Sequence, residues 1–574
     1  MKKFHPIITA HALVLCTAII FPRIVQAGAS SSPVRAKHGM VVSSHALASA
    51  AGVKILQAGG NAVDAAIATG FALAVTLPSA GNIGGGGFML VHTKDGKVAA
   101  FDFREKAPAS AHARMYLDDS GRYTKPVNHE GYLAVGVPGT VAGFFLAHEK
   151  LGRKPMKELI APAIDLAEKG FAVSWGLHDD FAFLTETFRQ YPATAQAFLK
   201  NGTEVYQPDE IWKQPDLANS LKRIQRFGRD GFYKGETARL LAAAMKKHGG
   251  LITAKDLADY QAKERTPIHG TYRGHDIYSM YPPSSGGTAL VEMLNILEGF
   301  DLRQAGFGSA QHLHLVAEAM RRAFADRARH LGDPDFNPNL PLARLTSKEY
   351  AAGLRRGISL NRVSPSDPVT MSEAYESSET THYSVIDAEG NAVVVTYTLE
   401  DWYGSKIVAE GAGFLLNNEM GDFNPWPGHT DSTGLIGTDP NLVAPGKRML
   451  SSMTPAIIAK DGKPFLLIGS PGGRTIINTV LQAVLNVIDF DMDVAEAIAA
   501  PRIHHQWLPN ILRVEKFGIS SDTQKLLEMF GHQVRVSRSS RSQGSAMGIM
   551  IDFQTGLRLG AADPRSDDGA ALGY

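Results

Sequence analysis

The sequence changes character abruptly at Thr380. The preceding stretch, residues 362–379, is polar, contains proline and has few large apolar side chains, which is typical of an exposed linker. Two runs rich in β-branched and aromatic residues follow, 380–386 and 392–399, with a turn at 387–391 between them. The pattern predicts a β-hairpin that begins at the junction between an exposed linker and a core strand.

The register of this hairpin decides which side chains face each other. If Asp387 pairs with Asn391 across the turn, Thr380 lies opposite Thr398 and two hydroxyl groups meet at the open end. A slip of one residue would separate them. Threonine is also common in strands for its β propensity alone, so the hairpin by itself leaves both interpretations open.

A threonine at such a junction can become an N-terminal nucleophile when the chain is cut before it. The hydroxyl of Thr380 is a weak nucleophile, but a freed α-amino group has a pKa of about 8 and can act as the adjacent general base. Thr398 would then orient the hydroxyl, as the third member of a catalytic triad does. This hypothesis uses no histidine as a base.

Composition excludes several other classes of protein. The chain has 574 residues, 44% hydrophobic and 20% charged, which is a globular composition and not that of a disordered chain. Its 58 Lys and Arg balance 57 Asp and Glu, so no overall positive charge drives binding to nucleic acid or anionic membranes. The single cysteine, Cys16, excludes a disulfide framework and any multi-cysteine metal site.

The amino terminus predicts export. Lys2 and Lys3 precede a mostly apolar run at 7–21, and small residues around 25–27 provide a signal-peptidase site, so residues 1–27 are predicted to be a cleaved signal peptide. The alternative, an anchoring membrane helix, needs about 20 apolar residues, and this run is shorter and contains a histidine. Because no later apolar run reaches about 18 residues, the mature protein is predicted to be periplasmic or secreted, without a membrane span.

Apolar periodicity predicts the other elements in outline. Helical spacing over 45–77, broken at a glycine pair, indicates two packed helices, and residues 88–91 with 98–101 indicate a strand pair. The glycine run 84–87 enters a strand and no Gly-Lys-Ser/Thr follows it, so close backbone packing is favoured over phosphate binding. Further helices are predicted over 156–169, 237–248, 289–297 and 310–331.

Two polar loops adjoin apolar runs after the hairpin, at 450–455 and 469–474. In the second loop, Gly472 and Gly473 present backbone N–H groups without side-chain obstruction, as an oxyanion hole requires. A glycine pair is more often a simple turn, so this motif alone does not decide its role.

Together these residues resemble the γ-glutamyltranspeptidase (glutathione hydrolase) family of N-terminal-nucleophile hydrolases, especially its exported bacterial members. The resemblance covers essentially the whole mature chain. It rests on motifs in the same order: 102–108 (DFREKAP), 380–384 (TTHYS), 416–423 (LNNEMGDF), 450–453 (LSSM), 469–473 (GSPGG) and 563–565 (DPR). It implies an α+β fold, a four-layer αββα sandwich built jointly by two subunits cut from one precursor.

The resemblance also implies roles for individual residues. It places an autocatalytic cleavage between Glu379 and Thr380, giving a large subunit of residues 28–379 and a small subunit of 380–574 that stay together as a heterodimer. It implies Thr380 as nucleophile, Thr398 as its hydroxyl partner, Gly472 and Gly473 as oxyanion hole, Arg104, Ser451 and Ser452 as the clamp on the substrate α-carboxylate, and Glu400, Glu419 and Asp422 around the α-amino group.

The implied activity is cleavage of the γ-glutamyl amide of glutathione and related compounds through an ester on Thr380. The acyl group then passes to water or to amino-acid and dipeptide acceptors, with no metal or cofactor. Because a γ-glutamyl group is a zwitterion, a planar guanidinium suits its carboxylate and acidic side chains suit its ammonium. The sequence departs from the family pattern at Glu379, Glu400 and Thr433, where some relatives carry an amide, an asparagine and a tyrosine.

Four other functions have to be weighed against this one. A cephalosporin-type amide acylase of the same superfamily would not need an ammonium-binding acid, so Asp422 argues against it. A metallohydrolase is disfavoured because His312 and His314 would lie about 200° apart on a helix and the sequence contains no H-E-x-x-H motif. An α/β-hydrolase is disfavoured because the sequence contains no G-x-S-x-G elbow. A binding protein for γ-glutamyl compounds would stay one chain on a denaturing gel, whereas a self-cleaving enzyme gives two fragments.

Overall fold

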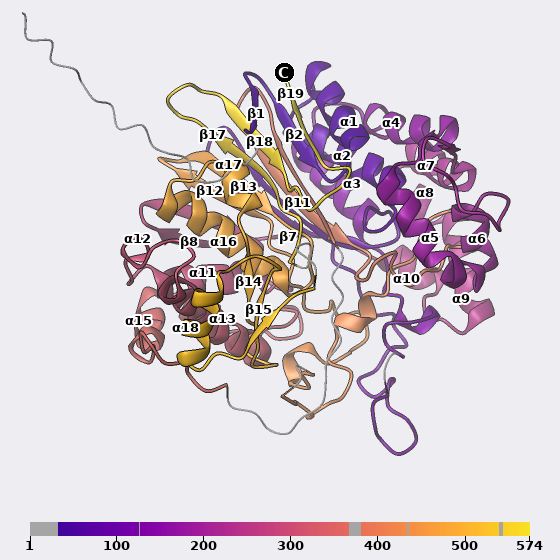
Figure 1. Cartoon of the computed structure of the whole chain (residues 1–574). Coiled ribbons are helices and arrows are strands. Elements are labelled where there is room, and N and C mark those ends of the chain that lie inside the picture. The colour runs from indigo at the N-terminus through magenta and orange to yellow at the C-terminus, as the bar shows by residue number, and fades with distance from the viewer. Residues whose placement is uncertain (1–31, 125–126, 367–379, 433–434, 539–542) are drawn as a thin grey trace, which may run out of the picture.

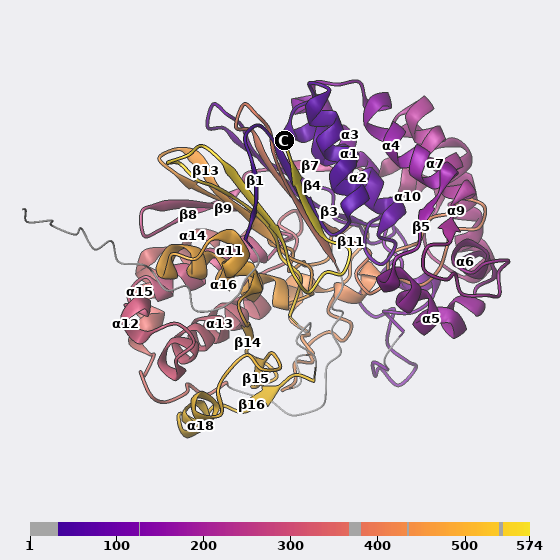
Figure 2. The same ribbon diagram turned by 45° about the horizontal axis from the view of Figure 1, so that its top comes forward.

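The computed structural model describes residues 32–124, 127–366, 380–432, 435–538 and 543–574. Over these residues two antiparallel sheets of seven strands pack face to face, and helices cover both outer faces (Figures 1 and 2). The predicted α+β, four-layer αββα sandwich is therefore confirmed.

Both sheets combine strands from either side of Thr380. Sheet I runs in the order β1 (Val34–Ala36), β18 (Arg558–Ala562), β17 (Met547–Ile551), β13 (Lys463–Gly469), β12 (Ala456–Lys460), β9 (His275–Ser279) and β8 (Ile268–Tyr272). Sheet II runs in the order β19 (Ala570–Gly573), β2 (Met40–Ser43), β10 (Thr381–Ile386), β11 (Ala392–Thr398), β3 (Gly86–His92), β4 (Val98–Asp102) and β7 (Lys263–Arg265). The predicted hairpin, β10 with β11, thus lies in the middle of sheet II.

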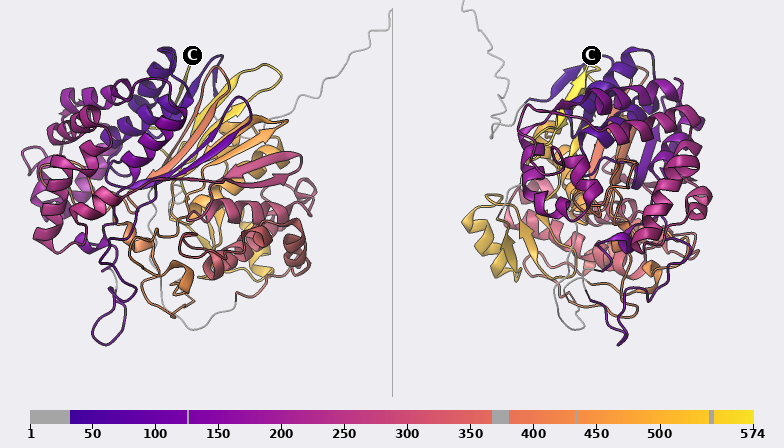
Figure 3. Two further views of the ribbon diagram at one scale, coloured as in Figure 1. Left: turned by 180° about the vertical axis from the view of Figure 1, so that it is seen from behind. Right: turned by 90° about the vertical axis from the view of Figure 1, so that its right-hand side faces the viewer.

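Two groups of helices form the outer layers, one on each side of the sheets (Figure 3). Sheet II is covered by α1 (Ala46–Gln57), α2 (Ala62–Thr76) and α3 (Thr140–Leu151), with α4 (Met156–Lys169) and α7 (Pro215–Phe227) behind them. Sheet I is covered by α11 (Gly286–Leu297), α16 (Thr475–Phe490) and α17 (Val494–Ala499), with α13 (Ala310–His330) packed on α11.

The remaining helices and strands extend these layers. The helices are α5 (Trp175–Arg189), α6 (Pro192–Phe198), α8 (Asp230–Tyr233), α9 (Gly235–His248), α10 (Ala254–Asp259), α12 (Leu302–Ala305), α14 (Leu342–Leu345), α15 (Lys348–Arg356) and α18 (Ser521–Met529). The strands are β5 (Phe171–Ala172), β6 (Ile211–Trp212), β14 (Ile503–His504), β15 (Leu512–Val514) and β16 (Val534–Val536).

Strand β11 shows why the sandwich has two cores. Val393, Val395 and Tyr397 belong to the core between sheet II and its helices, whereas Ala392 and Val394 belong to the core that includes sheet I. Successive side chains of a strand point to opposite faces, so a strand covered on both faces needs an apolar residue at nearly every position. All seven residues of β11 are buried, which accounts for its almost unbroken apolar sequence.

The predicted elements and the hairpin register are confirmed. The two helices expected over 45–77 are α1 and α2, the strand pair is β3 with β4, and the four further helices are α4, α9, α11 and α13. Thr381 pairs with Tyr397 and Ile386 with Ala392, which is the register that sets Thr380 against Thr398 at the end of the hairpin.

The exposed-linker prediction needs a correction at Ser366. Arg362 and Pro365 are exposed as predicted, and residues 367–379 lie outside the described residues. Ser366, just before them, is instead buried and accepts a hydrogen bond from Arg321. Because Arg321 also pairs with Glu318, Ser366 is held against α13.

The glycine run 84–87 is confirmed as a place of close backbone packing. A β-carbon at Gly85 would lie 2.1 Å from the Thr398 carbonyl oxygen, and one at Gly87 would lie 2.4 Å from the Thr396 carbonyl oxygen. A side chain at either position would force β11 away from β3. The run therefore fixes the end of β11, where Thr398 lies.

Candidate active site

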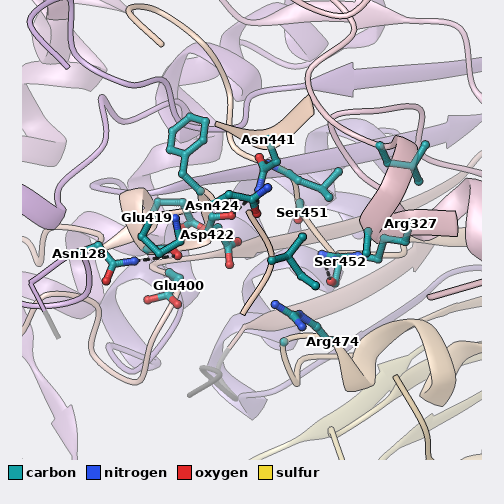
Figure 4. A pocket seen from close by; sticks show the side chains of 18 of the residues that line it. Asn128, Arg327, Glu400, Glu419, Asp422, Asn424, Asn441, Ser451, Ser452 and Arg474 are labelled. Atoms are coloured by element: carbon teal, nitrogen blue, oxygen red, sulfur yellow. Dashed lines mark hydrogen bonds between the residues drawn. The ribbon is translucent and has the colours of Figure 1, made fainter. Parts of the chain in front are cut away.

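A polar pocket with a cavity of about 100 Å³ opens at the end of the hairpin (Figure 4). Its walls come from β10 and β11, from the loop after β4, from the short helix η2 (Glu419–Asp422), from the segment 450–453 and from the loop before α16. The predicted site residues that line it are Arg104, Thr380, Thr398, Glu400, Glu419, Asp422, Ser451, Ser452 and Gly473, while Gly472 lies next to the wall.

Thr380 and Thr398 lie at the open end of the β10–β11 hairpin, and both residues are buried, with exposed fractions of 7% and 3%. Thr380 directly precedes β10, and Thr398 is the last residue of β11. The Glu400 N–H donates to the Thr398 hydroxyl oxygen at 2.9 Å. Because an N–H only donates, the Thr398 hydroxyl proton is directed to a different acceptor, which suits a residue that orients a second hydroxyl.

The glycine pair forms the turn that starts α16. Gly472 and Gly473 have φ values of 127° and 54°, which side-chain-bearing residues rarely adopt. A β-carbon at Gly472 would lie 2.3 Å from the Thr475 hydroxyl oxygen. The Thr475 N–H donates to the Gly472 carbonyl at 3.0 Å, so the turn leads directly into the positive end of the α16 dipole. The backbone here is suited to hold a developing negative charge.

Arg104 is fully buried and surrounded by carboxylates. Its Nη1 pairs with Glu419 and its Nη2 with Asp422, and Glu105 Oε2 lies 3.6 Å from Nη1. Its Nε also faces the Met449 carbonyl at 3.4 Å. Burial lowers the pKa of Arg104, but the carboxylates outweigh it and raise that pKa, so the guanidinium stays charged. To hold a substrate carboxylate, Arg104 would have to open one of these contacts.

Glu400, Glu419 and Asp422 form one side of the pocket, here called the acidic wall. Burial raises the pKa of Glu400 to about 7, and it raises the pKa of Glu419 well above its usual value. Glu400 has a φ of 83°, a conformation that non-glycine residues avoid and that functional sites often contain. A positive charge in the pocket would lower these raised pKa values and stabilise the ionised carboxylates, so the acidic wall suits a positively charged group of a ligand.

Ser451 and Ser452 form the opposite side of the pocket. The Ser451 N–H donates to the Pro283 carbonyl and the Ser285 N–H donates to the Ser451 carbonyl, each at 2.8 Å. These bonds hold the segment 450–453 against the start of α11. The two serine side chains are thus placed by backbone pairing rather than by a regular element.

Sequence analysis missed several residues of this pocket. His129 lies in the wall with its Nδ1 3.4 Å from Glu400 Oε1, and Asn128, Arg327 and Arg474 also line it. Burial lowers the pKa of His129, but Glu400, together with Asp422 and Asp401, outweighs burial and raises that pKa. Asn128, His129 and Arg327 lie outside the quoted motifs and reach the pocket only through the tertiary structure, whereas Arg474 directly follows the glycine pair in the loop 469–474.

His382, the histidine closest in sequence to the hairpin nucleophile, lies outside the pocket lining. Its ring is fully buried between the sheets, where a β-carbon at Gly469 would lie 2.2 Å from it, and its Nδ1 lies 2.8 Å from the Thr396 hydroxyl. Burial lowers the pKa of His382 to about 3, so the ring is neutral and is not placed as a base. Glu379 and Thr433 lie outside the described residues.

Other predicted features can be placed only in part. Within the described part of the chain, no three His, Cys, Asp or Glu side chains are grouped to hold a metal ion. His314 packs instead against His532, with 2.8 Å between Nδ1 and Nε2. None of the helices in the ranges given above combines the length and apolar character needed to cross a bilayer.

Comparisons with known proteins agree with the fold and the pocket. The model of the γ-glutamyltranspeptidase family matches residues 48–573. A glutathione hydrolase proenzyme of Escherichia coli (strain K12) is 51% identical over 545 residues, which are 94% of this chain and 93% of that protein. The crystal structure of a cephalosporin acylase from Bacillus halodurans is similar with a TM-score of 0.83 at 28% identity, covering 97% of this chain and 99% of that one. The structure of Helicobacter pylori γ-glutamyltranspeptidase is similar with a TM-score of 0.55 at 45% identity, covering 59% of this chain and 95% of that one.

The family match spans almost all of the described residues and includes every wall of the pocket. The TM-score of 0.83 shows that this chain shares its fold with the acylase structure, and the sequence identity to a glutathione hydrolase is far above the level at which only a fold is shared. The chain belongs to the γ-glutamyltranspeptidase family of N-terminal-nucleophile hydrolases.

Proposed function

We propose that the chain is a self-cleaving γ-glutamyl hydrolase and transferase that acts on glutathione and related γ-glutamyl compounds. The observation that carries this proposal is the position of Thr380, at the start of a central strand and in one pocket with Thr398, the glycine turn and the acidic wall. A nucleophile, an orienting hydroxyl, an oxyanion site and a zwitterion site are the parts that this reaction needs.

Maturation comes first in this scheme. The Thr380 hydroxyl oxygen attacks the carbonyl carbon of Glu379, and the peptide C–N bond breaks as its nitrogen takes up a proton. Water then hydrolyses the resulting ester, leaving a carboxylate on Glu379 and a free amine on Thr380. The products are a large subunit ending at residue 379 and a small one of 380–574, which the two shared sheets hold together.

Catalysis then uses the freed amine as the base. The neutral amine takes the Thr380 hydroxyl proton as the oxygen attacks the γ-carbonyl, and the N–H groups of Gly472 and Gly473 stabilise the oxyanion. The amine returns its proton to the leaving nitrogen, which leaves a γ-glutamyl ester on Thr380. Water or the amino group of an acceptor attacks this ester, and the same amine accepts the proton from that nucleophile. The ester C–O bond then breaks, and the amine passes this proton to the Thr380 oxygen, which restores the free hydroxyl and the neutral amine.

The acidic wall is proposed to bind the substrate ammonium, and Arg104 with Ser451 and Ser452 to bind its carboxylate. The competing acylase function is supported less well, because an acylase would not need this wall and two acylase proenzymes of Pseudomonas are 38% and 39% identical, against 51% for the glutathione hydrolase. We also propose that amino acids and dipeptides serve as acceptors and that residues 1–27 direct export to the periplasm or the medium.

A pair of anilides separates the two activities. The mature protein is assayed with a γ-glutamyl anilide and with the glutaryl anilide, which lacks only the ammonium. A γ-glutamyl enzyme should favour the first by at least about tenfold in kcat/KM, the usual size of a lost charge-assisted contact. It should also release glutamate from glutathione, with added glycylglycine diverting part of the product. Equal rates on the two anilides would instead identify an acylase.

A further inference from the structure

Arg327 reaches the pocket from α13, a helix that contains none of the quoted motifs. It is 9% exposed and lies in the pocket wall beside Ser452. Its Nη2 donates to the Ser452 hydroxyl oxygen at 3.0 Å (Figure 4). Its Nε donates to the Ser285 hydroxyl oxygen at 2.8 Å. Arg327 therefore contacts directly one of the two serines assigned to the substrate carboxylate.

This contact makes the Ser452 hydroxyl oxygen an acceptor and leaves its proton to be donated elsewhere. A guanidinium carries donors only, so the Ser452 oxygen accepts from Arg327 and its own proton must go to another acceptor. Ser451 is held in the same sense, because its hydroxyl oxygen accepts from the Met453 N–H at 3.1 Å. Among the residues that the structure describes, neither serine hydroxyl donates to a protein acceptor. Both are thus set to donate to an anionic group in the pocket.

Ser285 extends the effect of Arg327 to the backbone. With its oxygen accepting from Arg327, the Ser285 hydroxyl donates to the Ser451 carbonyl at 2.6 Å. One guanidinium therefore orders both the side chain of Ser452 and the main chain of Ser451.

Arg104 alone is poorly placed to bind the substrate α-carboxylate. Its terminal nitrogens are already paired with Glu419 and Asp422, so a substrate carboxylate has to compete with two acids for this guanidinium. The side of the pocket at Ser451 and Ser452 offers donors and includes a second guanidinium.

We propose that Arg327 is a positioning residue that makes Ser451 and Ser452 a donor pair specific for the substrate α-carboxylate. This inference rests on the proposed function and adds to it a second arginine that determines specificity at the carboxylate end. Arg327 acts through the serines, so its contribution should depend on the presence of that carboxylate.

The test compares two anilides that differ only in the carboxylate, γ-glutamyl anilide and 4-aminobutyryl anilide. Arg327→Met should lower kcat/KM for the first by about tenfold to a hundredfold, mainly through KM, and for the second by less than about threefold. Arg327→Lys keeps a donor and a charge, so it should recover part of the discrimination. The control is Arg329→Met, since Arg329 is exposed on the same helix and stacks on Trp507 outside the pocket.

Ser452→Ala provides the second measurement, and it removes only a hydroxyl. If Arg327 acts through Ser452, the double variant should lose less than the two single losses combined. Equal losses on both anilides in normally cleaved protein, or fully additive losses, would overturn the inference and leave Arg327 a structural residue. If Arg327→Met does not mature, the same comparison is made with Arg327→Lys and Ser452→Ala. In each variant the loss of kcat/KM on γ-glutamyl anilide is divided by the loss on 4-aminobutyryl anilide, and a ratio of one overturns the inference. A wild-type protein that fails on γ-glutamyl anilide would overturn the proposed function instead.

Discussion

Glu400→Gln tests the acidic wall through the pH dependence of substrate binding. Burial raises the pKa of Glu400 to about 7, while His129 at 3.4 Å acts in the opposite direction. Because the pKa is raised, the carboxyl group is protonated below about pH 7 and charged above it. Only the charged form attracts the substrate ammonium, so KM should fall as the pH rises through about 7.

The size of the effect follows from the ionised fraction. With this pKa, about 10% of Glu400 is ionised at pH 6 and about 90% at pH 8, so KM should be roughly ninefold lower at pH 8 if only the ionised form binds. In Glu400→Gln the KM at pH 8 should rise by about tenfold or more, as expected for a lost charge-assisted hydrogen bond. The KM profile of the variant should be flat through pH 7.

Steady-state hydrolysis of a γ-glutamyl anilide between pH 5.5 and 8.5 measures KM and kcat separately. The control is Glu410→Gln, which alters an exposed carboxylate paired with Lys247 and should keep the wild-type profile. An inflection of KM near pH 7 that keeps its full size in Glu400→Gln would refute the reasoning, because a different group would then be titrating.

Thr398→Ala should lower kcat by about a hundredfold or more with little change in KM, and Thr398→Ser should restore most of it; equal loss in both would exclude an orienting hydroxyl. Gly85→Ala puts a β-carbon 2.1 Å from the Thr398 carbonyl and should cost about 1–3 kcal/mol in the free energy of unfolding, so an unchanged Tm would contradict it. His382→Asn should keep the alkaline rise in pre-steady-state acylation, because burial already holds the ring neutral; loss of that titration in cleaved, folded protein would point to a histidine base. Arg104→Lys keeps the charge but loses the two-pronged pairing with Glu419 and Asp422, and its KM should rise at least about tenfold; unchanged kinetics would remove it from the substrate site.

Local pattern was enough to predict the parts of the site that lie on the hairpin. The turn at 387–391, closed by Asp387 and Asn391, predicts the register of β10 and β11, and that register sets Thr380 against Thr398. The glycine run 84–87 was predictable for a similar reason, since only backbone packing explains four glycines that enter a strand. The hairpin depends on neighbours in sequence, whereas the residues that pack on the glycine run, Thr396 and Thr398, are distant in sequence and are identified only by the structure.

The other walls of the pocket depend on contacts between distant segments, which periodicity does not report. His129 enters because its loop packs on η2, where a β-carbon at Gly421 would lie 2.3 Å from the ring. Arg327 enters because α13 passes behind the start of α11, and its helical pattern is that of an ordinary buried helix. The ion pairs of Arg104 with Glu419 and Asp422 were likewise not anticipated, although all three residues had been singled out.

The central claim is that Thr380 becomes both the new N-terminus and the acylated residue, and mass spectrometry tests it most directly. The purified wild-type protein should give two chains, the smaller beginning at Thr380, and brief exposure to a γ-glutamyl substrate followed by acid quenching should add one γ-glutamyl group to the peptide that begins there. Thr380→Ala should remain a single chain and acquire no label. A wild-type protein that stays uncut, a Thr380→Ala variant cut at the same bond, or a label on any other residue would contradict the account.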